Sequence, residues 1–325
     1  MDKEHQTTRK NSDKGNMKVS IIVSVYNEAD ILPITLPLLL NQDYPKEKTE
    51  IILVDDASTD ETPQLLESSE WAESITVISH PENKGRAATR NSGIKVATGE
   101  LLILLDCDIE VEAYFISRHI EYYQNEKVIG VVSHIRTWDS KSKDKYHQYI
   151  FFGKRGASVI GENKPIPFKY FILGCSSIKT NAVKRTGLFN ENLPTYGIDL
   201  EYAYRLWKIF PEGLFYSKTI NVYMHNVKTL EEALASFRQY GQCNVPIILE
   251  EYPELAPYVA ADLVKSTSGE LTLKVIIGTI LINPLVFQLT KRILKITPFP
   301  LSNILIRYLL AASAAMGYRK YLENN

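Results

Sequence analysis

Three segments near the start of the chain share one pattern: VSIIVSVYNE at residues 19–28, IILVDDASTD at residues 51–60 and ELLILLDCD at residues 100–108. Each begins as an apolar run too short for a helix and ends in acidic residues. Runs of this kind predict buried strands of a parallel sheet. A further strand is expected at residues 75–79. Helices are expected at residues 31–40, after Pro63, and at 86–97, the last closed by Gly99.

This alternation of strands and helices predicts an α/β fold with a mostly parallel, doubly wound central sheet and helices on both faces. Ligands of such sheets bind at the carboxyl ends of the strands, which is where the acidic residues stand. Past residue 128 the alternation weakens. Strands near 128–135, 168–180 and 215–223, and a helix near 200–210, predict a mixed half that holds a second substrate.

The composition narrows the class of protein. The chain has 325 residues, room for roughly two domains, with 45% hydrophobic and 23% charged residues. Its 37 Lys and Arg residues balance 38 Asp and Glu residues, which argues against a basic nucleic-acid-binding domain. Three widely spaced cysteines form no disulfide framework and fit a reducing cytosol. Residues 1–18 form a polar tail without the apolar core of a signal peptide.

The residues at the strand ends suggest a chemistry. Asp106 and Asp108 follow a buried strand, and two carboxylates there suit a divalent cation that also binds diphosphate oxygens. The alternative is a strand end with solvated acids. Asp55-Asp56 would accept a hydrogen bond from a nucleobase or take part in helix capping. Arg86 and Arg90 stand one turn apart at the start of a helix, where a diphosphate is favoured, although their segment could be only a turn.

Four blocks of the sequence resemble glycosyltransferase family 2: residues 19–28, 51–60, the segment NKGRAATRNSGIKVATG at 83–99, and LDCD at 105–108. They occur in the family's order and at its spacing, and the resemblance continues through residues 174–205. It implies the GT-A fold, which binds nucleotide diphosphate sugars, and the transfer of a sugar with inversion. It also implies a divalent metal, manganese or magnesium.

Residue by residue, the resemblance implies a donor site. Ser24, Tyr26 and Glu28 would line the nucleoside pocket. Asp56 would read the base, with Asp55 the less favoured candidate. Arg90 would neighbour the base or the diphosphate, Asp106 would approach the ribose and the sugar, and Asp108 would ligate the metal.

The segment YGIDLEYAYR at residues 196–205 is similar to the family's Gly-x-Glu-Asp block, whose Asp is the general base. Here Ile198-Asp199 replaces Glu-Asp, so Asp199 remains as the base candidate and the neighbouring acid is lost or shifted to Glu201. Asp199 also suits the N-cap of a helix. Cys175 stands where the family often has Asn, which puts a hydrogen bond to the transferred sugar in doubt.

Two further features bear on the reaction. His225 matches a late histidine that ligates the metal in part of the superfamily, although most single histidines have no such role. The Gln-x-x-Arg-Trp motif of processive synthases is absent around residues 237–241. We therefore expect an enzyme that adds one sugar per encounter.

Residues 229–325 are expected to be helical, with membrane-associating segments at about 271–289 and 299–317. The apolar run of the first, residues 275–289, is short of the ~20 residues of a spanning helix. Asn283-Pro284 interrupts the first and Arg307 lies in the second. The helices would lie in the membrane interface, enter one leaflet as a hairpin, or be buried in their own domain or a dimer. Membrane association is the expectation that fits a lipid-linked acceptor.

The sequence thus predicts a GT-A domain at residues 19–228, with a nucleotide-binding half at 19–110 and an acceptor half at 111–228. The expected function is metal-dependent, inverting, non-processive transfer of a hexose or N-acetylhexosamine, with a UDP-sugar favoured as donor. The acceptor would be a hydroxyl of a lipid-linked or surface glycan on the cytoplasmic side of the cell membrane, held by a peripheral or monotopic enzyme. Alternatives are a polyprenyl-phosphate glycosyltransferase and a catalytically silent nucleotide-binding module.

Overall fold

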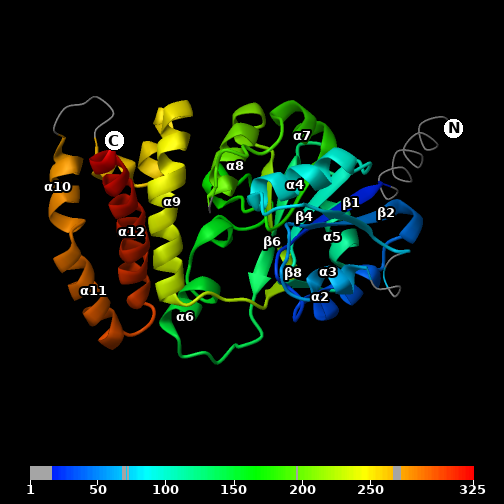
Figure 1. Ribbon diagram of the computed structural model, residues 1–325, viewed down its shortest axis with the longest axis horizontal. Helices are drawn as coiled ribbons and strands as arrows, with labels where there is room; N and C mark the ends of the chain where they lie inside the picture. The colour runs from blue at the N-terminus through cyan, green and yellow to red at the C-terminus, as the bar shows by residue number, and fades with distance from the viewer. Residues whose placement is uncertain (1–16, 68–70, 72, 195–196, 266–271) are drawn as a thin grey trace. The chain divides into compact units, whose positions relative to one another are not determined.

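The structure is a computed structural model that describes residues 17–67, 71, 73–194, 197–265 and 272–325 (Figure 1). The chain forms two compact units. Unit 1 comprises residues 1–138, 156–190 and 202–226, and unit 2 comprises residues 139–155, 191–201 and 227–325. The last boundary between the two units lies between residues 226 and 227, whereas the sequence placed the end of the GT-A domain at residue 228. The two shorter segments of unit 2 had no signal in the sequence.

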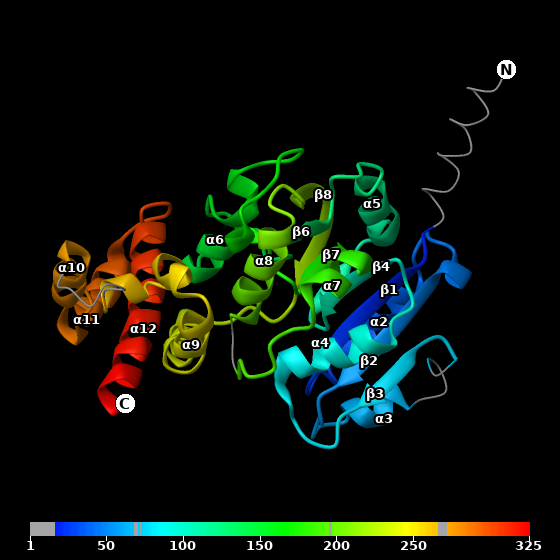
Figure 2. The same cartoon turned by 90° about the horizontal axis from the view of Figure 1, so that it is seen from above.

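Unit 1 contains an eight-stranded sheet of order β3-β2-β1-β4-β7-β6-β8-β5 among the described residues. Its first half alternates as expected, with β1 (Val19–Val25), α2 (Leu32–Leu40), β2 (Thr49–Asp55), α3 (Thr62–Leu66), β3 (Thr76–Ser79), α4 (Gly85–Val96) and β4 (Leu101–Asp106). β1 pairs in parallel with both β2 and β4, and β2 with β3. α4 covers one face of these strands and α2 and α3 cover the other (Figures 1 and 2).

The second half of the sheet is mixed. It consists of β5 (Ile109–Val111), β6 (Gly130–Arg136), β7 (Cys175–Lys179) and β8 (Leu214–Met224), with α5 (Phe115–Tyr122), α7 (Thr180–Thr186) and most of α8 (Ile198–Ile209). β7 is antiparallel to β4 and β6, and β5 is antiparallel to β8, whereas β6 and β8 are parallel. An antiparallel strand inserted beside β4 is what interrupts the alternation in the sequence.

The connection between β4 and β5 is short for two strands that lie far apart in the sheet order. β4 ends at Asp106 and β5 begins at Ile109, although three other strands separate them in the sheet order. Three residues span at most about 11 Å of extended chain. The β5 edge of the sheet therefore returns to the carboxyl end of β4, and Asp108 stands in the connection.

Gly99 has a different role from the one expected. α4 ends at the extended residue Ala97, without a left-handed glycine. The backbone N–H of Gly99 donates to Ser20 Oγ at 2.7 Å, and a Cβ on Gly99 would lie 2.6 Å from the backbone nitrogen of Ser20. The glycine is needed for a close approach of two backbones rather than for a helix cap.

Unit 2 is helical. It contains α6 (Lys145–Phe151), α9 (Leu230–Glu251), α10 (Leu273–Leu281), α11 (Pro284–Ile296), α12 (Ser302–Asn324) and the first turn of α8. α12 runs along α9 at close range, because a Cβ at Gly241 would lie 1.8 Å from the carbonyl oxygen of Ala314. The buried side chains of α12 include Ile306, Leu309 and Ala315. Most of the second apolar segment is thus core of unit 2.

Within the described ranges, no single helix is both long and apolar enough to cross a bilayer. α10 and α11 satisfy the length and composition only as a pair, which is bent by 62° at its junction. Asn283 directly precedes α11, and its side chain accepts hydrogen bonds from the backbone N–H groups of Leu285 and Val286. The Asn-Pro interruption read from the sequence is therefore the N-cap of a new helix.

Candidate active site

The carboxyl ends of β1, β2 and β4 bring the first expected site residues together. In the strand register, Ser24 of β1 lies opposite both Val54 of β2 and Asp106 of β4, and Val25 lies opposite Asp55. Because these strands are parallel, the acids that follow them meet at one edge of the sheet. Ser24 Oγ is buried and has no hydrogen-bond partner among the residues that the structure describes.

The loop after β1 is fastened to the loop after β2. Asn27, which has a φ of 55°, donates its backbone N–H to Ser58 Oγ at 2.8 Å. Its side-chain Oδ1 accepts from the backbone N–H of Thr59 at 2.8 Å. Glu28 donates its N–H to Thr62 Oγ1 at 2.9 Å. This leaves Tyr26 47% exposed, with a ring surface on which a base can stack.

Asp56 and Asp55 are both buried and both have partners within the chain. Asp56 accepts from the backbone N–H groups of Lys84 and Gly85 at 2.8 Å each, and its Oδ1 lies 2.8 Å from His80 Nδ1. It therefore anchors the start of α4, which lacks a side-chain cap of its own. Asp55 accepts from Ser58. His80 was missed at the sequence level, since a histidine 24 residues from Asp56 gives no local signal.

Asp106 is held by two arginines from α4. Its Oδ1 lies 3.2 Å from Arg90 Nη2, and its Oδ2 lies 3.8 Å from Arg86 Nη1. Burial alone would raise the pKa of Asp106, but the charges of Arg90 and Arg86 hold it below the usual value. Arg90 is almost fully buried, with its guanidinium over the ring of Phe189. Arg86 is half exposed, so it is the better placed of the two to meet a solvent-borne anion.

Gly174 lies against the Asp106 carboxylate. The backbone N–H of Asp106 donates to the carbonyl oxygen of Gly174 at 2.8 Å. A Cβ on Gly174 would lie 2.4 Å from Asp106 Oδ2, closer than any ordinary contact. The sequence alone gave no reason to connect these residues, because β7 reaches β4 by antiparallel pairing.

The acids beside Asp106 repel one another. Burial, followed by the charges of Asp108 and Asp106, raises the pKa of Glu28 to about 7. Burial and the charge of Asp106 raise the pKa of Asp108 to about 6. Carboxyl groups with raised pKa values in one cluster favour a bound positive charge.

The expected metal ligands Asp108 and His225 are neighbours. The backbone N–H of His225 donates to the carbonyl oxygen of Asp108 at 3.0 Å, while its Nε2 lies 2.8 Å from Glu110 Oε2. Among the described residues no group of three or more His, Cys, Asp or Glu side chains is arranged to hold a metal. Carboxylate oxygens beside an imidazole fit a cation that takes its remaining ligands from phosphate and water.

The remaining candidates lie elsewhere in the chain. Asp199 and the buried Glu201 stand in the first turn of α8, in the part of the helix that belongs to unit 2. Tyr196, which begins the expected base motif, lies outside the described residues. Cys175 is fully buried on β7.

Curated relatives of the chain are glycosyltransferases. The Bacillus spizizenii poly(ribitol-phosphate) beta-glucosyltransferase is 43% identical over 94 residues, 28% of this chain and 15% of that protein. The Escherichia coli UDP-Glc:alpha-D-GlcNAc-diphosphoundecaprenol beta-1,3-glucosyltransferase WfaP is 32% identical over 197 residues, 60% of this chain and 71% of that protein. The Haloferax volcanii glycosyltransferase AglE is 33% identical over 103 residues, 31% of this chain. The match spans 34% of AglE, so this chain covers less than two thirds of several relatives.

Solved structures share the fold. The mannosyltransferase PcManGT from Pyrobaculum calidifontis, in complex with GDP-Man and Mn2+, has a TM-score of 0.61 at 20% identity, over 95% of this chain and 88% of that one. Residues 1–349 of S. aureus TarS in complex with UDP give a TM-score of 0.56 at 18% identity, over 95% and 92%. These similarities confirm the expected GT-A fold with a helical extension. The family model for glycosyl transferase family 2 matches residues 20–186 of the 325, and the chain belongs to this family.

Proposed function

We propose that this protein is a metal-dependent, inverting, non-processive glycosyltransferase. It transfers one hexosyl or N-acetylhexosaminyl group from a nucleotide diphosphate sugar, with a UDP-sugar favoured, to a hydroxyl of a lipid-linked or surface glycan. The observation that carries the proposal is the cluster of Glu28, Asp106 and Asp108 at the carboxyl ends of β1 and β4, beside Arg86 and Arg90. WfaP and TarS support it through the UDP-glucose and the UDP in their descriptions.

The donor would bind across the ends of β1, β2 and β4. Tyr26 offers an exposed ring to the base, and Ser24 offers a buried hydroxyl that has no partner within the described part of the chain. Arg86 meets the diphosphate at the first turn of α4, where the backbone N–H groups also favour an anion. Arg90 acts through Asp106, which it holds in place. The manganese in the PcManGT complex supports a divalent cation here, which Asp108 and His225 would hold.

The reaction is a single displacement at the anomeric carbon. The acceptor oxygen bonds to that carbon as the bond to the diphosphate oxygen breaks, so the configuration inverts. Asp199 removes the proton of the acceptor hydroxyl as general base. A bound divalent cation supplies charge neutralisation for the departing diphosphate. In Asp199→Asn, transfer is lost while the fold is kept. Retained turnover would favour the polyprenyl-phosphate reaction, whose anionic acceptor needs no base.

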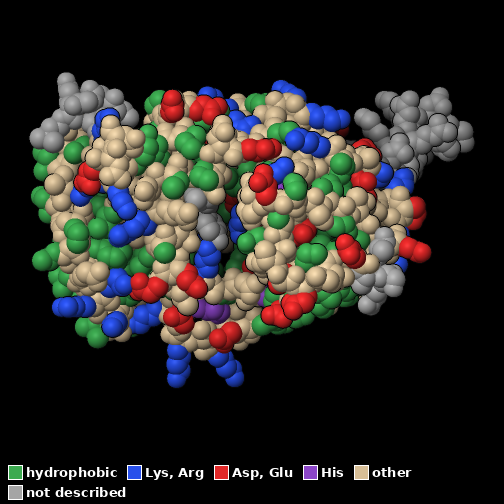
Figure 3. All heavy atoms as spheres, in the orientation of Figure 1, with side chains coloured by type: hydrophobic (Ala, Val, Ile, Leu, Met, Phe, Trp, Pro, Cys, Tyr) green, Lys and Arg blue, Asp and Glu red, His purple; other side chains and the backbone are tan. Residues whose placement is uncertain are grey.

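Unit 2 carries a surface suited to a membrane. Many large apolar side chains of α10 and α11 are exposed, among them Ile280 at 62% and Leu285 at 76%, whereas Phe287 and Leu294 are buried. Hydrophobic side chains gather over these two helices in Figure 3. Residues 272–322 contain seven Lys or Arg residues and no Asp or Glu, which matches an anionic bilayer. We infer that α10 and α11 lie in the interface of the cytoplasmic leaflet, close to a lipid-linked acceptor.

Flotation with lipid vesicles tests the membrane surface. The protein is expected to float with vesicles of phosphatidylcholine and phosphatidylglycerol and less with phosphatidylcholine alone. The combined change of Ile280, Leu285 and Leu289 to Ser removes side chains that each contribute about 1.5–3 kcal/mol on full burial, so it should abolish flotation. Val159→Ser is the matched control, since Val159 is 57% exposed in unit 1. Equal flotation of the triple variant would contradict the inference.

Thermal unfolding with UDP, GDP, CMP and dTDP, each with and without manganese, tests the donor site. A ligand at 100 times its dissociation constant adds about 2.7 kcal/mol to stability, which is visible as a shift of the midpoint. We expect a manganese-dependent shift with one nucleotide that Asp108→Asn removes. No shift with any nucleotide would refute the proposal.

A further inference from the structure

Unit 1 exposes a stacked pair of aromatic rings near Asp108. Trp138, two residues past the end of β6, lies on the ring of Tyr223 of β8. Their centroids are 4.0 Å apart and their planes differ by 10°. Trp138 is nonetheless 61% exposed. Tyr223 covers one side of the indole, so much of the remaining ring surface faces water.

The side chain of Glu110 holds the indole of Trp138 in its orientation. Its Nε1 donates to Glu110 Oε2 at 3.1 Å, and the same oxygen lies 2.8 Å from His225 Nε2. His225 in turn donates its backbone N–H to the carbonyl oxygen of Asp108. The stacked pair is therefore linked through Glu110 to His225, one of the expected metal ligands.

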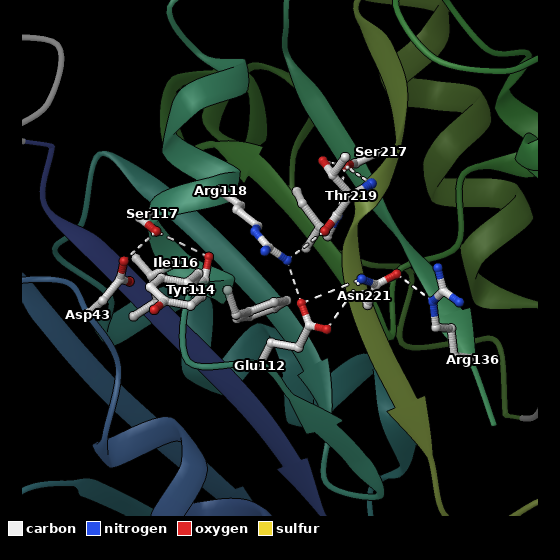
Figure 4. A network of polar contacts seen from close by, with 12 residues as sticks. Asp43, Glu112, Tyr114, Ile116, Ser117, Arg118, Arg136, Ser217, Thr219 and Asn221 are labelled. Atoms are coloured by element: carbon white, nitrogen blue, oxygen red, sulfur yellow. Dashed lines mark hydrogen bonds and ion pairs between the residues drawn. The ribbon is translucent and has the colours of Figure 1, made fainter. Parts of the chain in front are cut away.

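A hydrogen-bonded network around Asn221 of β8 joins β6, β8 and the residues before α5 (Figure 4). Asn221 lies between Arg136 and Glu112: its Oδ1 accepts from Arg136 Nε at 2.5 Å, and its Nδ2 lies 3.3 Å from Glu112 Oε1. Arg118 of α5 donates to Glu112 and to the carbonyl oxygen of Thr219. Asn221 and Tyr223 share one face of β8, because alternate residues of a strand do so.

The strand pairing places Tyr223 between its two neighbours on the sheet. Its register partners are Arg136 on β6 and Glu110 on β5. The indole thus rests on a platform that the sheet and its polar network hold rigid, rather than on a loose loop. Rigid aromatic surfaces lose little entropy when a ligand binds.

We propose that Trp138, stacked on Tyr223, binds a pyranose ring of the acceptor glycan. The C–H face of a pyranose is apolar and slightly positive, and it complements the negative face of an indole. The hydroxyls at the edge of the sugar would remain in water or meet Glu110 and Arg136. β6, β8 and β5 lie on the opposite side of β4 from β1 and β2, which carry the candidate nucleoside pocket, so the acceptor is the favoured occupant. The inference rests on the proposed function.

Intrinsic tryptophan fluorescence tests the proposal with three probes: methyl β-glucopyranoside, methyl N-acetyl-β-glucosaminide and cellobiose. At least one probe should change the emission of the unaltered protein at millimolar concentration, with the indole of Trp138 as the reporter. Saturation-transfer NMR measures the same binding in Trp138→Ala, where we expect a loss of about fivefold or more. Phe152→Ala removes an exposed aromatic side chain of unit 2 and serves as control.

The outcomes separate this proposal from the function on which it rests. Loss of saccharide binding in Trp138→Ala, with an unchanged nucleotide-dependent thermal shift and near-UV circular dichroism, supports an acceptor platform. Saccharide binding within twofold of the unaltered protein, or no binding of any probe, overturns it. A nucleotide shift that disappears in Trp138→Ala assigns the ring to the donor and also overturns it. No nucleotide shift in the unaltered protein refutes the proposed function, whatever the saccharides do.

Discussion

Replacing Gly174 with alanine is expected to displace the Asp106 carboxylate without disturbing the rest of unit 1. The new Cβ would lie 2.4 Å from Asp106 Oδ2 and 2.8 Å from Cγ, whereas ordinary contacts begin at 3.4 Å. The carboxylate must therefore move by about 1 Å, since its backbone is tied to the carbonyl oxygen of Gly174. Gly174 is not among the described glycines with positive φ, so the contact alone penalises the alanine.

A displacement of this size at a reacting centre costs about 10²-fold in rate, and overpacking costs about 1–3 kcal/mol of stability. Turnover is measured with the donor that the thermal shifts select. Ser176→Ala, two residues further along, is the control, because among the described residues nothing hydrogen-bonds the buried Ser176 Oγ and its loss should cost nothing. If Gly174→Ala kept its turnover within about twofold and its melting midpoint, the inferred position of Asp106 would not matter to the reaction.

Three further predictions concern other parts of the chain. Burial lowers the pKa of His119 from 6.5 to about 3, so the unfolded state binds one more proton between these values and stability falls as the pH drops. Denaturant unfolding at pH 6, 5 and 4 should show the unaltered protein losing about 1.4 kcal/mol per pH unit more than His119→Gln; equal slopes would contradict the assignment. Arg90→Lys should lower the free energy of nucleotide binding or of unfolding by about 1.5–3 kcal/mol, because lysine lacks the planar guanidinium that holds Asp106. Arg86→Lys should lower it less, because Arg86 is half exposed. Gly241→Ala should lower the melting midpoint of unit 2, since its Cβ would meet the Ala314 carbonyl oxygen at 1.8 Å, and an unchanged midpoint would refute the close packing of α9 and α12.

The half of the fold that the sequence predicts well is the half with local signals. β1, β2 and β4 are nearly continuous buried runs, and acids follow each of them. Because parallel strands end at a common edge, the meeting of Ser24, Asp55 and Asp106 follows from the sequence once the alternation is recognised.

What the sequence could not predict depends on contacts between distant residues. Asp56 is one example: its carboxylate anchors the start of α4 through Lys84 and Gly85, which only the folded chain brings near. The contact of Gly174 with Asp106 arises because β7 pairs antiparallel to β4, and the alternation of strands and helices in the sequence does not predict this pairing. The apolar residues of 299–317 read as membrane-seeking, but an apolar helix face looks the same in sequence whether it meets lipid or α9.

The short connection from Asp106 to Ile109 has a consequence for the order of events in a catalytic cycle. Only Cys107 and Asp108 lie between the strand that ends at the donor site and the strand whose Glu110 orients Trp138, which leaves little slack. A shift of Asp108 on loading of the donor must therefore be transmitted along the chain to Glu110. We expect the affinities for the two substrates to be thermodynamically linked, each raising the other by the same factor. Reciprocity of this kind would favour a ternary complex over wasteful hydrolysis of the donor by water.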